Sequence, residues 1–344
     1  MSSPVERAAA VLGERVRRQV PVGPLTTYRV GGAAALFFEA ADEADLRLAA
    51  AAVSESGIPV VVIGRGSNLL VADRGFPGLA VVLGAGFTDI AVTGTEVIAG
   101  AAVSLPVLAR RTAAAGLTGL EWAVGVPGSV GGAVRMNAGG HGSDVSGTLV
   151  AARVVDLRGE SGPGGHPSGT PGGVREMGAD ELDLGYRRSA LGPADVVVAA
   201  RFGLEQGDRA TSEAAIADIV RWRREHQPGG SNGGSVFANP PGDSAGRLIE
   251  AAGLRGFRRG SAFVSPKHAN FVQVDDGGSA DDVASLVTEV ARVVADRTGV
   301  HLRVENHLVG SPQGPSVPLS GGQGPSGPLS GGQGLSGPLS GGEA

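Results

Sequence analysis

The glycine-rich stretch at residues 116–142 restricts the fold more than any other part of the chain. It reads GLTGLEWAVGVPGSVGGAVRMNAGGHG and contains one proline and no lysine. Glycine tolerates positive φ and leaves backbone N–H groups uncovered, and successive uncovered N–H groups form a concave anion site. Such a surface suits a large, flat ligand that carries phosphate. A plain glycine-rich turn between two strands accounts for the stretch equally well.

Composition excludes several classes of protein. The hydrophobic fraction is 42% and the aromatic fraction 4%, so the cores must be built from Val, Leu, Ile and Ala. A net charge of −5 gives no general attraction to nucleic acid. The chain has no cysteine and six scattered histidines, so we expect no disulfide and no metal site. The apolar runs are too short for membrane insertion, and we expect a cytoplasmic monomer.

A β-α-β unit is predicted near the N-terminus. Ala33–Ala40 is strand-like, residues 41–56 form an alanine-rich helix that Gly57 ends, and residues 58–63 are a buried strand, an order that favours parallel pairing. Residues 64–69 (GRGSNL) carry two of the three glycines of a dinucleotide fingerprint, without the third or the following helix. We therefore expect a phosphate-binding turn or a plain tight turn there, and no Rossmann NAD site.

The rest of the chain is predicted as short alternating elements. The pattern indicates a β-meander over 76–103, helices over 3–18, 105–115, 211–226, 245–252 and 279–298, and strands over 149–157, 196–202 and 300–309. Residues 158–173 (RGESGPGGHPSGTPGG) lack apolar periodicity and predict a mobile loop. Three decapeptide repeats, GPSVPLSGGQ, GPSGPLSGGQ and GLSGPLSGGE, predict a disordered tail over 311–344.

Eight motifs follow one another in order over residues 20–310: TTYRVGG, VIGRGSNLLVAD, GLTGLEWAVGVPGSVGGAVRMNAGG, LGYRRSAL, GGSVFANP, AGRLIEAAGL, SPKHANFV and LRVENHLVG. In these motifs the chain resembles the UDP-N-acetylenolpyruvoylglucosamine reductase family. One glycine-rich motif is weak support, whereas eight ordered motifs, several of them not based on glycine, are strong support. The resemblance is to the subclass that lacks a tyrosine-bearing insertion after YRRS.

The resemblance implies an α+β fold with a two-part FAD-binding domain of the vanillyl-alcohol-oxidase (PCMH) type and a C-terminal α/β substrate-binding domain. The expected division is an N-terminal helix at 1–19, the FAD-binding domain at 20–205, the substrate-binding domain with its returning terminal strand at 206–310, and the tail at 311–344. The resemblance also implies non-covalent FAD, NADPH as co-substrate and a UDP-sugar substrate. The expected reaction reduces an enolpyruvyl ether to the lactyl ether of UDP-N-acetylmuramate, in peptidoglycan precursor synthesis.

The resemblance also implies three catalytic residues. Arg187 of YRRS would hold the carboxylate on which negative charge develops, and Ser235 of GSVF would protonate the adjacent carbon. Glu305 would hydrogen bond beside that carboxylate in its protonated form. Substrate contacts are expected from Tyr186, Asn239 and His268. The residues expected to bind FAD are Tyr28, Arg29, Gly64, Arg65, Gly66, Ser67, Asn68, Leu69, Gly125, Pro127, Gly128, Ser129, Gly132, Ala133, Asn137, Ala138 and Gly139.

Each catalytic assignment has a plain alternative. Arg188 is the obvious competitor of Arg187. Ser235 is also a natural turn residue after two glycines, and Glu305 is also an ordinary edge-strand carboxylate. Two other functions stay open, an FAD-dependent alcohol oxidase on the same scaffold and an inactive flavin-binding paralogue.

The chain departs from the family pattern around the terminal glutamate. Val304, Asn306 and His307 replace the usual proline, valine and arginine, so local strand geometry and one cationic group are expected to differ. Ala238 stands where lysine is common after GSVF, which removes a charge near the substrate.

Overall fold

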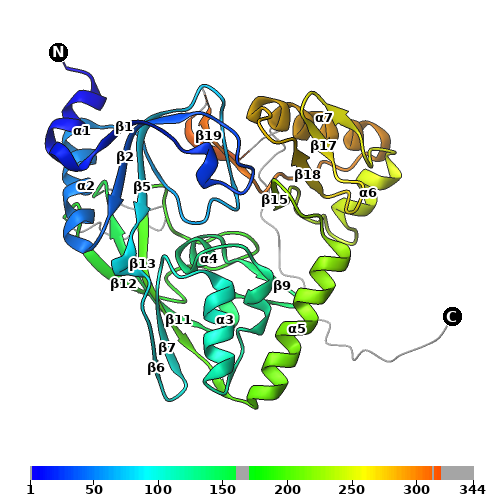
Figure 1. Ribbon diagram of the computed structural model, residues 1–344, viewed down its shortest axis with the longest axis horizontal. Helices are drawn as coiled ribbons and strands as arrows, with labels where there is room; N and C mark the ends of the chain where they lie inside the picture. Colours follow the sequence, from blue (N-terminus) through cyan, green and yellow to red (C-terminus); the bar gives the residue numbers. More distant parts are fainter. Residues whose placement is uncertain (1, 160–169, 312–313, 319–344) are drawn as a thin grey trace.

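The computed structural model describes residues 2–159, 170–311 and 314–318, which form three units (Figure 1). The first unit carries a four-stranded sheet with two helices, and the second carries a five-stranded antiparallel sheet. The third unit is a smaller sheet covered by two helices. None of the helices in these residue ranges is long and apolar enough to cross a membrane.

The first sheet has the strand order β1-β2-β5-β3. Its elements are α1 (Pro4–Leu12), β1 (Arg17–Pro21), β2 (Ala33–Ala40), α2 (Glu43–Ser56), β3 (Val60–Val62) and β5 (Phe76–Leu83). The predicted β-α-β unit is present, but β5 lies between β2 and β3 and runs parallel to both. Helix α2 begins at Asp42, whose side chain accepts a hydrogen bond from the Asp45 N–H, and ends at Gly57 in the left-handed conformation.

The prediction of a separate N-terminal helix was wrong in extent. Helix α1 ends at Leu12 because Gly13 adopts φ 61°, and the following residues form β1, which pairs with β2. The side chains of Ala8 and Leu12 are buried in the core of the first unit. The segment is therefore part of the first unit.

The second sheet has the strand order β12-β11-β13-β7-β6. Its elements are β6 (Ile90–Thr93), β7 (Glu96–Gly100), α3 (Leu105–Ala114), α4 (Val130–Met136), β11 (Leu149–Asp156), β12 (Val174–Gly178) and β13 (Asp195–Gly203). Within the predicted meander only β6 and β7 form an antiparallel hairpin, since β5 joins the first sheet. The two sheets share a core, in which Val196 and Val198 of β13 pack with Phe38. Of the predicted mobile loop, residues 160–169 lie outside the described residues.

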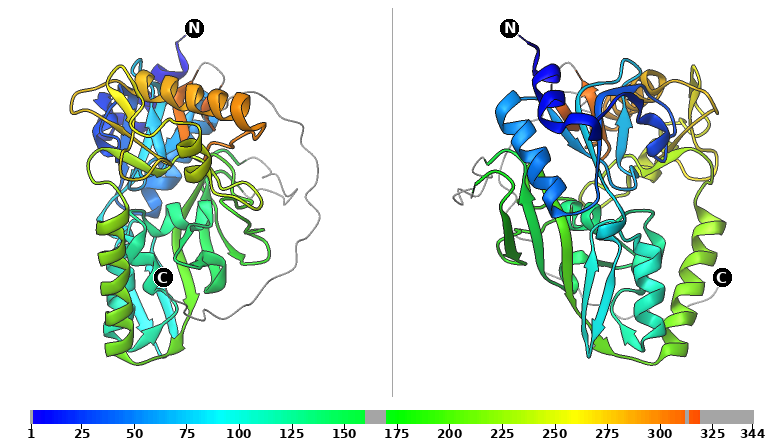
Figure 2. Two further views of the ribbon diagram at one scale, coloured as in Figure 1. Left: turned by 90° about the vertical axis from the view of Figure 1, so that its right-hand side faces the viewer. Right: turned by 60° about the vertical axis from the view of Figure 1, so that its left-hand side comes forward.

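The third unit follows α5 (Arg209–His226), a helix that runs beside the second unit and leads up to the third (Figure 2). Helix α5 has Asp208 as its N-cap, whose side chain accepts from the Thr211 N–H, so the helix begins earlier than the expected residue 211. The other elements are β15 (Asn232–Ser235), α6 (Ala245–Ala251), β16 (Arg258–Arg259), β17 (Ala262–Val264), β18 (Phe271–Val274) and α7 (Ala280–Thr298). Helix α7 matches its prediction, with Ser279 as N-cap and Gly299 as C-cap.

The chain returns to the first unit through β19 (His307–Ser311), which pairs in parallel with β4 (Leu69–Val71). The predicted strand over 300–309 is only partly present, because Val304 makes an isolated bridge to Phe237 and Glu305 lies between this bridge and β19. The expectation of a tail without structure from residue 311 was wrong for Ser311 and for β20 (Gly314–Pro318), which pairs with β19. The first repeat has valine where the other two have glycine, and valine favours a strand. Residues 312–313 and 319–344 lie outside the described residues.

Short elements complete the glycine-rich stretch. They are β8 (Leu117–Thr118), which pairs with β14 (Glu205–Gln206), the 3₁₀ helix η4 (Glu121–Gly125), and β9 (Gly139–Gly140), which pairs with β10 (Ser143–Asp144). Helix α4 was not expected there, because its sequence contains two adjacent glycines. Ser129 caps it by accepting from the Gly132 N–H, and Val130 and Val134 are buried in the core of the second unit. Packing against the sheet therefore overrides the low helix propensity.

Candidate active site

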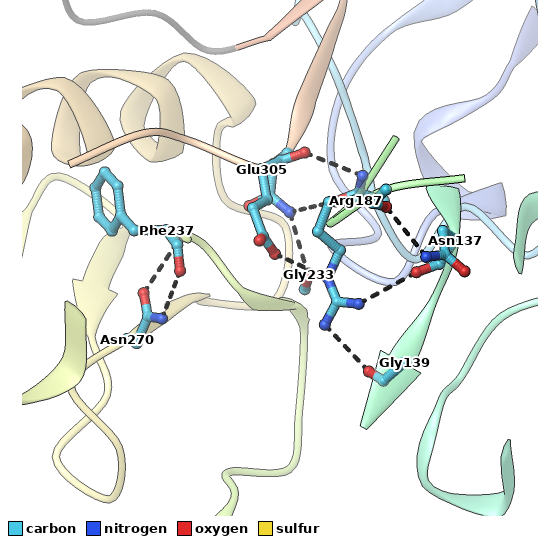
Figure 3. Close-up of polar contacts among 10 residues, drawn as sticks. Asn137, Gly139, Arg187, Gly233, Phe237, Asn270 and Glu305 are labelled. Atoms are coloured by element: carbon cyan, nitrogen blue, oxygen red, sulfur yellow. Dashed lines mark hydrogen bonds and ion pairs between the residues drawn. The ribbon is translucent and has the colours of Figure 1, made fainter. Parts of the chain in front are cut away.

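Arg187 lies where the second unit meets the returning chain (Figure 3). It sits in a tight turn with φ 57°, a left-handed conformation that non-glycine residues seldom adopt. Its Nη2 donates to the Gly139 carbonyl at 3.1 Å and its Nη1 to the Asn137 carbonyl at 3.5 Å. Its Nε lies 3.5 Å from Glu305 Oε2. Two residues that were expected to act on one substrate carboxylate therefore lie in contact with each other.

Glu305 is held by its backbone from two sides. Its N–H donates to the Val236 carbonyl at 2.8 Å, and its carbonyl accepts from Asn68 Nδ2 at 3.0 Å. The side chain is 8% exposed, and Oε1 has no hydrogen-bond partner among the described residues. A buried polar atom without a partner is uncommon and carries a desolvation cost, so Oε1 is available to a ligand.

Ser235 is the last residue of β15, and its side chain is exposed. The next residue, Val236, accepts the hydrogen bond from the Glu305 N–H. The strand that carries it is fixed by Asn270, which is 4% exposed. Asn270 Oδ1 accepts from the Phe237 N–H at 2.9 Å, and Asn270 Nδ2 donates to the Phe237 carbonyl at 2.8 Å (Figure 3). An exposed hydroxyl on a fixed backbone is a suitable donor to a ligand. Asn270 belongs to the quoted motif SPKHANFV, but no role was predicted for it.

The three expected substrate residues differ in their surroundings. Tyr186 is 57% exposed, and the Arg187 guanidinium carbon lies 5.2 Å from the centre of its ring. Partial burial of the phenol, followed by the negative charge of Glu305, raises the pKa of Tyr186, so the phenol keeps its proton. Asn239 Oδ1 accepts from the Ala245 N–H at 3.1 Å, which ties it to the start of α6.

His268 supports the loop that precedes β18. Its ring packs edge-on against Phe271 at 4.8 Å, and its Nδ1 accepts from the Asn270 N–H at 3.2 Å. Burial lowers the pKa of His268, which favours the neutral ring that this acceptor role requires. Among the described residues, no contact joins His268 to Arg187 or Glu305.

The two glycine-rich turns expected to bind FAD lie against each other. A Cβ on Gly64 would come within 2.5 Å of Ser129 Oγ, so only glycine allows this approach. Gly66 has φ 61°, and its carbonyl accepts from the Thr27 N–H at 3.2 Å, close in sequence to the exposed Arg29. Within the described ranges, the backbone N–H groups of residues 64–68 have no protein acceptor. Free N–H groups beside exposed arginines fit a phosphate-bearing cofactor such as FAD.

Two residues expected to touch FAD instead have protein partners. Asn137 is 3% exposed, and its Nδ2 donates to the Gly185 carbonyl at 3.1 Å, while its Oδ1 accepts from the Ser146 N–H at 3.0 Å. It therefore joins the end of α4 to the turn that carries Arg187. Tyr28 is fully buried, and its hydroxyl donates to Asn306 Oδ1 at 3.1 Å. The structure favours positioning roles for both side chains.

An aromatic surface beside the site was missed by the sequence reasoning. Trp222 of α5 is 42% exposed and stacks on His226, with ring centres 4.8 Å apart and planes at 15°. The His141 ring lies edge-on to Trp222, with ring centres 5.2 Å apart. His141 is two residues after Gly139, whose carbonyl accepts a hydrogen bond from Arg187. The available sequence signal was Trp222 itself, one of two tryptophans in the chain and placed in a predicted helix. Among the described residues, no set of three or more His, Cys, Asp or Glu side chains is placed to hold a metal ion.

The comparisons with known proteins agree with this arrangement. Residues 34–161 match the family model for an FAD binding domain, and residues 226–309 match the model for the C-terminal domain of UDP-N-acetylenolpyruvoylglucosamine reductase. The two-part FAD-binding fold with an α/β C-terminal domain, expected from the sequence, is thereby confirmed.

Full-length relatives extend the match to most of the chain. The chain is 42% identical over 299 residues to the UDP-N-acetylenolpyruvoylglucosamine reductase of Acidiphilium cryptum, covering 87% of this chain and 92% of that one. It is 40% identical to the protein of the same name from Azorhizobium caulinodans, covering 90% and 97%. The crystal structure of the Thermus caldophilus reductase superposes with a TM-score of 0.72 at 34% identity, covering 86% of this chain and 98% of that one. The chain therefore belongs to the UDP-N-acetylenolpyruvoylglucosamine reductase family.

Proposed function

We propose that this protein reduces the enolpyruvyl group of UDP-N-acetyl-3-O-(1-carboxyvinyl)-glucosamine to UDP-N-acetylmuramate, with NADPH and non-covalent FAD, in peptidoglycan precursor synthesis. The observation that carries the proposal is the meeting of Arg187 with the buried Glu305 carboxyl, which has one oxygen without a protein partner. Ser235 is exposed on the adjoining strand. The names of the relatives support the substrate.

The residues around the glycine-rich turns would hold the cofactor. The N–H groups of residues 64–68, with Arg29 and Arg65, provide positive partial and full charges for the pyrophosphate. FAD, when bound, would supply the hydride chemistry that links NADPH to the methylene carbon of the substrate.

The protein side chains complete the reduction at the adjacent carbon. As the methylene carbon becomes a methyl group, the electron pair of the double bond moves toward the carboxylate and forms an enolate. The Arg187 guanidinium would neutralise this charge, and Glu305, which adjoins Arg187, would act beside the same carboxylate. The Ser235 hydroxyl would then give its proton to the carbon and regain one from solvent.

We also propose that the uridine moiety lies on the surface formed by Trp222, His226 and His141. Replacing Trp222 with alanine is expected to raise the KM for the UDP-sugar roughly tenfold, because stacking a base on an aromatic ring contributes about 1–3 kcal/mol. Steady-state kinetics measures this, and Trp222→Phe, which keeps a ring, is the matched control. A KM that is unchanged in the alanine variant would place the uridine elsewhere.

Spectroscopy of the purified holoenzyme tests the function as a whole. We expect a yellow protein whose flavin absorbance bleaches when NADPH is added anaerobically and returns when the enolpyruvyl sugar nucleotide is added. Rapid return in air alone would indicate an oxidase, and a protein that does not bleach would indicate an inactive flavin-binding protein. Comparing the rate of flavin reduction by NADPH with the rate by NADH shows which reductant the enzyme prefers.

The monomeric state and the cytoplasmic location remain predictions. In favour of a monomer, Arg187, Ser235 and Glu305 all come from one chain and adjoin one another. Sedimentation of the holoenzyme measures the mass in solution.

A further inference from the structure

Asn306 places a fully buried amide side chain directly after Glu305. Its Oδ1 accepts from the Tyr28 hydroxyl at 3.1 Å. Its Nδ2 donates to Asn68 Oδ1 at 2.9 Å and to the Gly233 carbonyl at 3.3 Å. An asparagine amide offers two N–H donors and one acceptor oxygen, and here both donors and the oxygen are used. The family usually has valine at this position, and the asparagine that replaces it finds a polar partner for each donor and for its oxygen.

The partners of Asn306 belong to separate segments. Tyr28 and Asn68 lie in the first unit, whereas Gly233 belongs to β15 of the third unit, the strand that ends in Ser235. β15 also approaches Tyr28 closely, because a Cβ on Gly233 would lie 2.5 Å from Tyr28 Cε2. The Asn306 amide thus fixes the cofactor side of the site relative to the substrate side.

Asn306 also fixes the orientation of Asn68. Because Asn68 Oδ1 receives the Asn306 donor, the Asn68 amino group must point the other way, and it donates to the Glu305 carbonyl at 3.0 Å. If the Asn68 amide were turned over, its amino group would face the Asn306 amino group, and its oxygen would face the Glu305 carbonyl oxygen. Glu305 is therefore held through a chain of two asparagines.

We propose that Asn306 is a positioning residue for the proton-transfer half of the reaction, a role that rests on the function proposed above. It sets the Glu305 backbone relative to Arg187 and to the strand of Ser235. A misplacement of about 1 Å costs on the order of 10²-fold in rate when reacting groups must be aligned. Reduction of the flavin by NADPH does not use Glu305 or Ser235, so we expect it to depend much less on Asn306 than reoxidation by the substrate does.

The experiment compares the two half-reactions of the holoenzyme in Asn306→Leu, which keeps the branched shape of the side chain and removes the amide. We expect flavin reduction by NADPH within about twofold of wild type, and reoxidation by the enolpyruvyl sugar nucleotide slower by about 10- to 100-fold. Thr112→Val is the matched control, because it removes a buried hydroxyl from α3, where Thr112 Oγ1 donates to the Leu108 and Ala109 carbonyls, outside the site. Its reoxidation rate is expected to stay within about threefold of wild type.

A double variant separates positioning from stability. Tyr28→Phe with Asn306→Leu removes the buried hydroxyl together with its acceptor, which costs less stability than leaving one unpaired. We expect its apoprotein to melt at a higher temperature than Asn306→Leu, while its reoxidation stays slow. If Asn306→Leu does not yield folded protein, the rates of the two half-reactions are compared in the double variant instead.

Three results would overturn the role of Asn306. They are equal slowing of both half-reactions, no slowing of either, and a reoxidation rate that recovers together with the melting temperature in the double variant. Failure of wild-type holoenzyme to be reoxidised by the sugar nucleotide is a different result. It would refute the proposed function and not the arrangement of Asn306.

Discussion

Replacing Ser235 with alanine is expected to slow reoxidation of the reduced enzyme by the enolpyruvyl sugar nucleotide by about 10²–10⁴-fold, the usual loss when a general acid is removed. The exposed hydroxyl at the end of β15 is the proposed proton source for the carbon, and alanine has no proton to give. Flavin reduction by NADPH should stay unchanged, since that step adds no proton to carbon. Anaerobic stopped-flow absorbance measures both steps.

The conservative variant Ser235→Cys tests whether the proton or the shape matters. A thiol is also a proton donor, so this variant is expected to retain more of the reoxidation rate than alanine does. The melting temperatures of both variants should match wild type, because Ser235 is exposed. Wild-type reoxidation in Ser235→Ala would exclude the residue as the acid.

Replacing Arg187 with methionine is expected to lower the reoxidation rate by roughly 10²–10³-fold, the range for losing one donor that stabilises developing negative charge. Methionine keeps much of the stem and removes the cation that lies 3.5 Å from Glu305 Oε2. The variant should also melt at a lower temperature, because Glu305 is 8% exposed and loses its cationic partner. Single-turnover kinetics and thermal melting measure the two effects.

Arg188→Met is the matched control for Arg187. Arg188 is 61% exposed and pairs with Asp183 at 2.6 Å on the surface. Surface ion pairs contribute about 0–1 kcal/mol, so we expect the control to keep its stability and its rate. A larger loss of rate in Arg188→Met than in Arg187→Met would reverse the assignment of the two arginines.

Local patterns predicted the elements whose ends and buried faces are encoded within a few residues. Helix α7 has its cap at Ser279, its apolar stripe and its terminal Gly299 in one continuous segment, and β2 is a short apolar run. Strand β1 was missed, because among the described strands it pairs only with β2, and its own sequence, RRQVP, carries little strand signal. Helix α4 was missed because packing decides its conformation against its glycines.

The site could be predicted only as a set of residue types. Motif resemblance pointed to Arg187 and Glu305, and the structure places them in contact. No local pattern shows that Asn137 and Tyr28 are buried and use their polar atoms within the protein, because their partners lie in distant segments. For the same reason Asn306 looked like a disturbance, although the fold supplies it with three partners.

The pairing of β4 with β19 has a consequence for synthesis on the ribosome. Among the described strands β4 pairs only with β19, and Asn68 meets Glu305 across a sequence separation of 237 residues. At about 5–20 residues per second, the turn at residues 64–68 waits on the order of 10–50 s for its closing segment to be translated. Nascent chains that stop before residue 305 are therefore expected to bind flavin weakly, and cofactor uptake is expected to be one of the last events in the biogenesis of this enzyme.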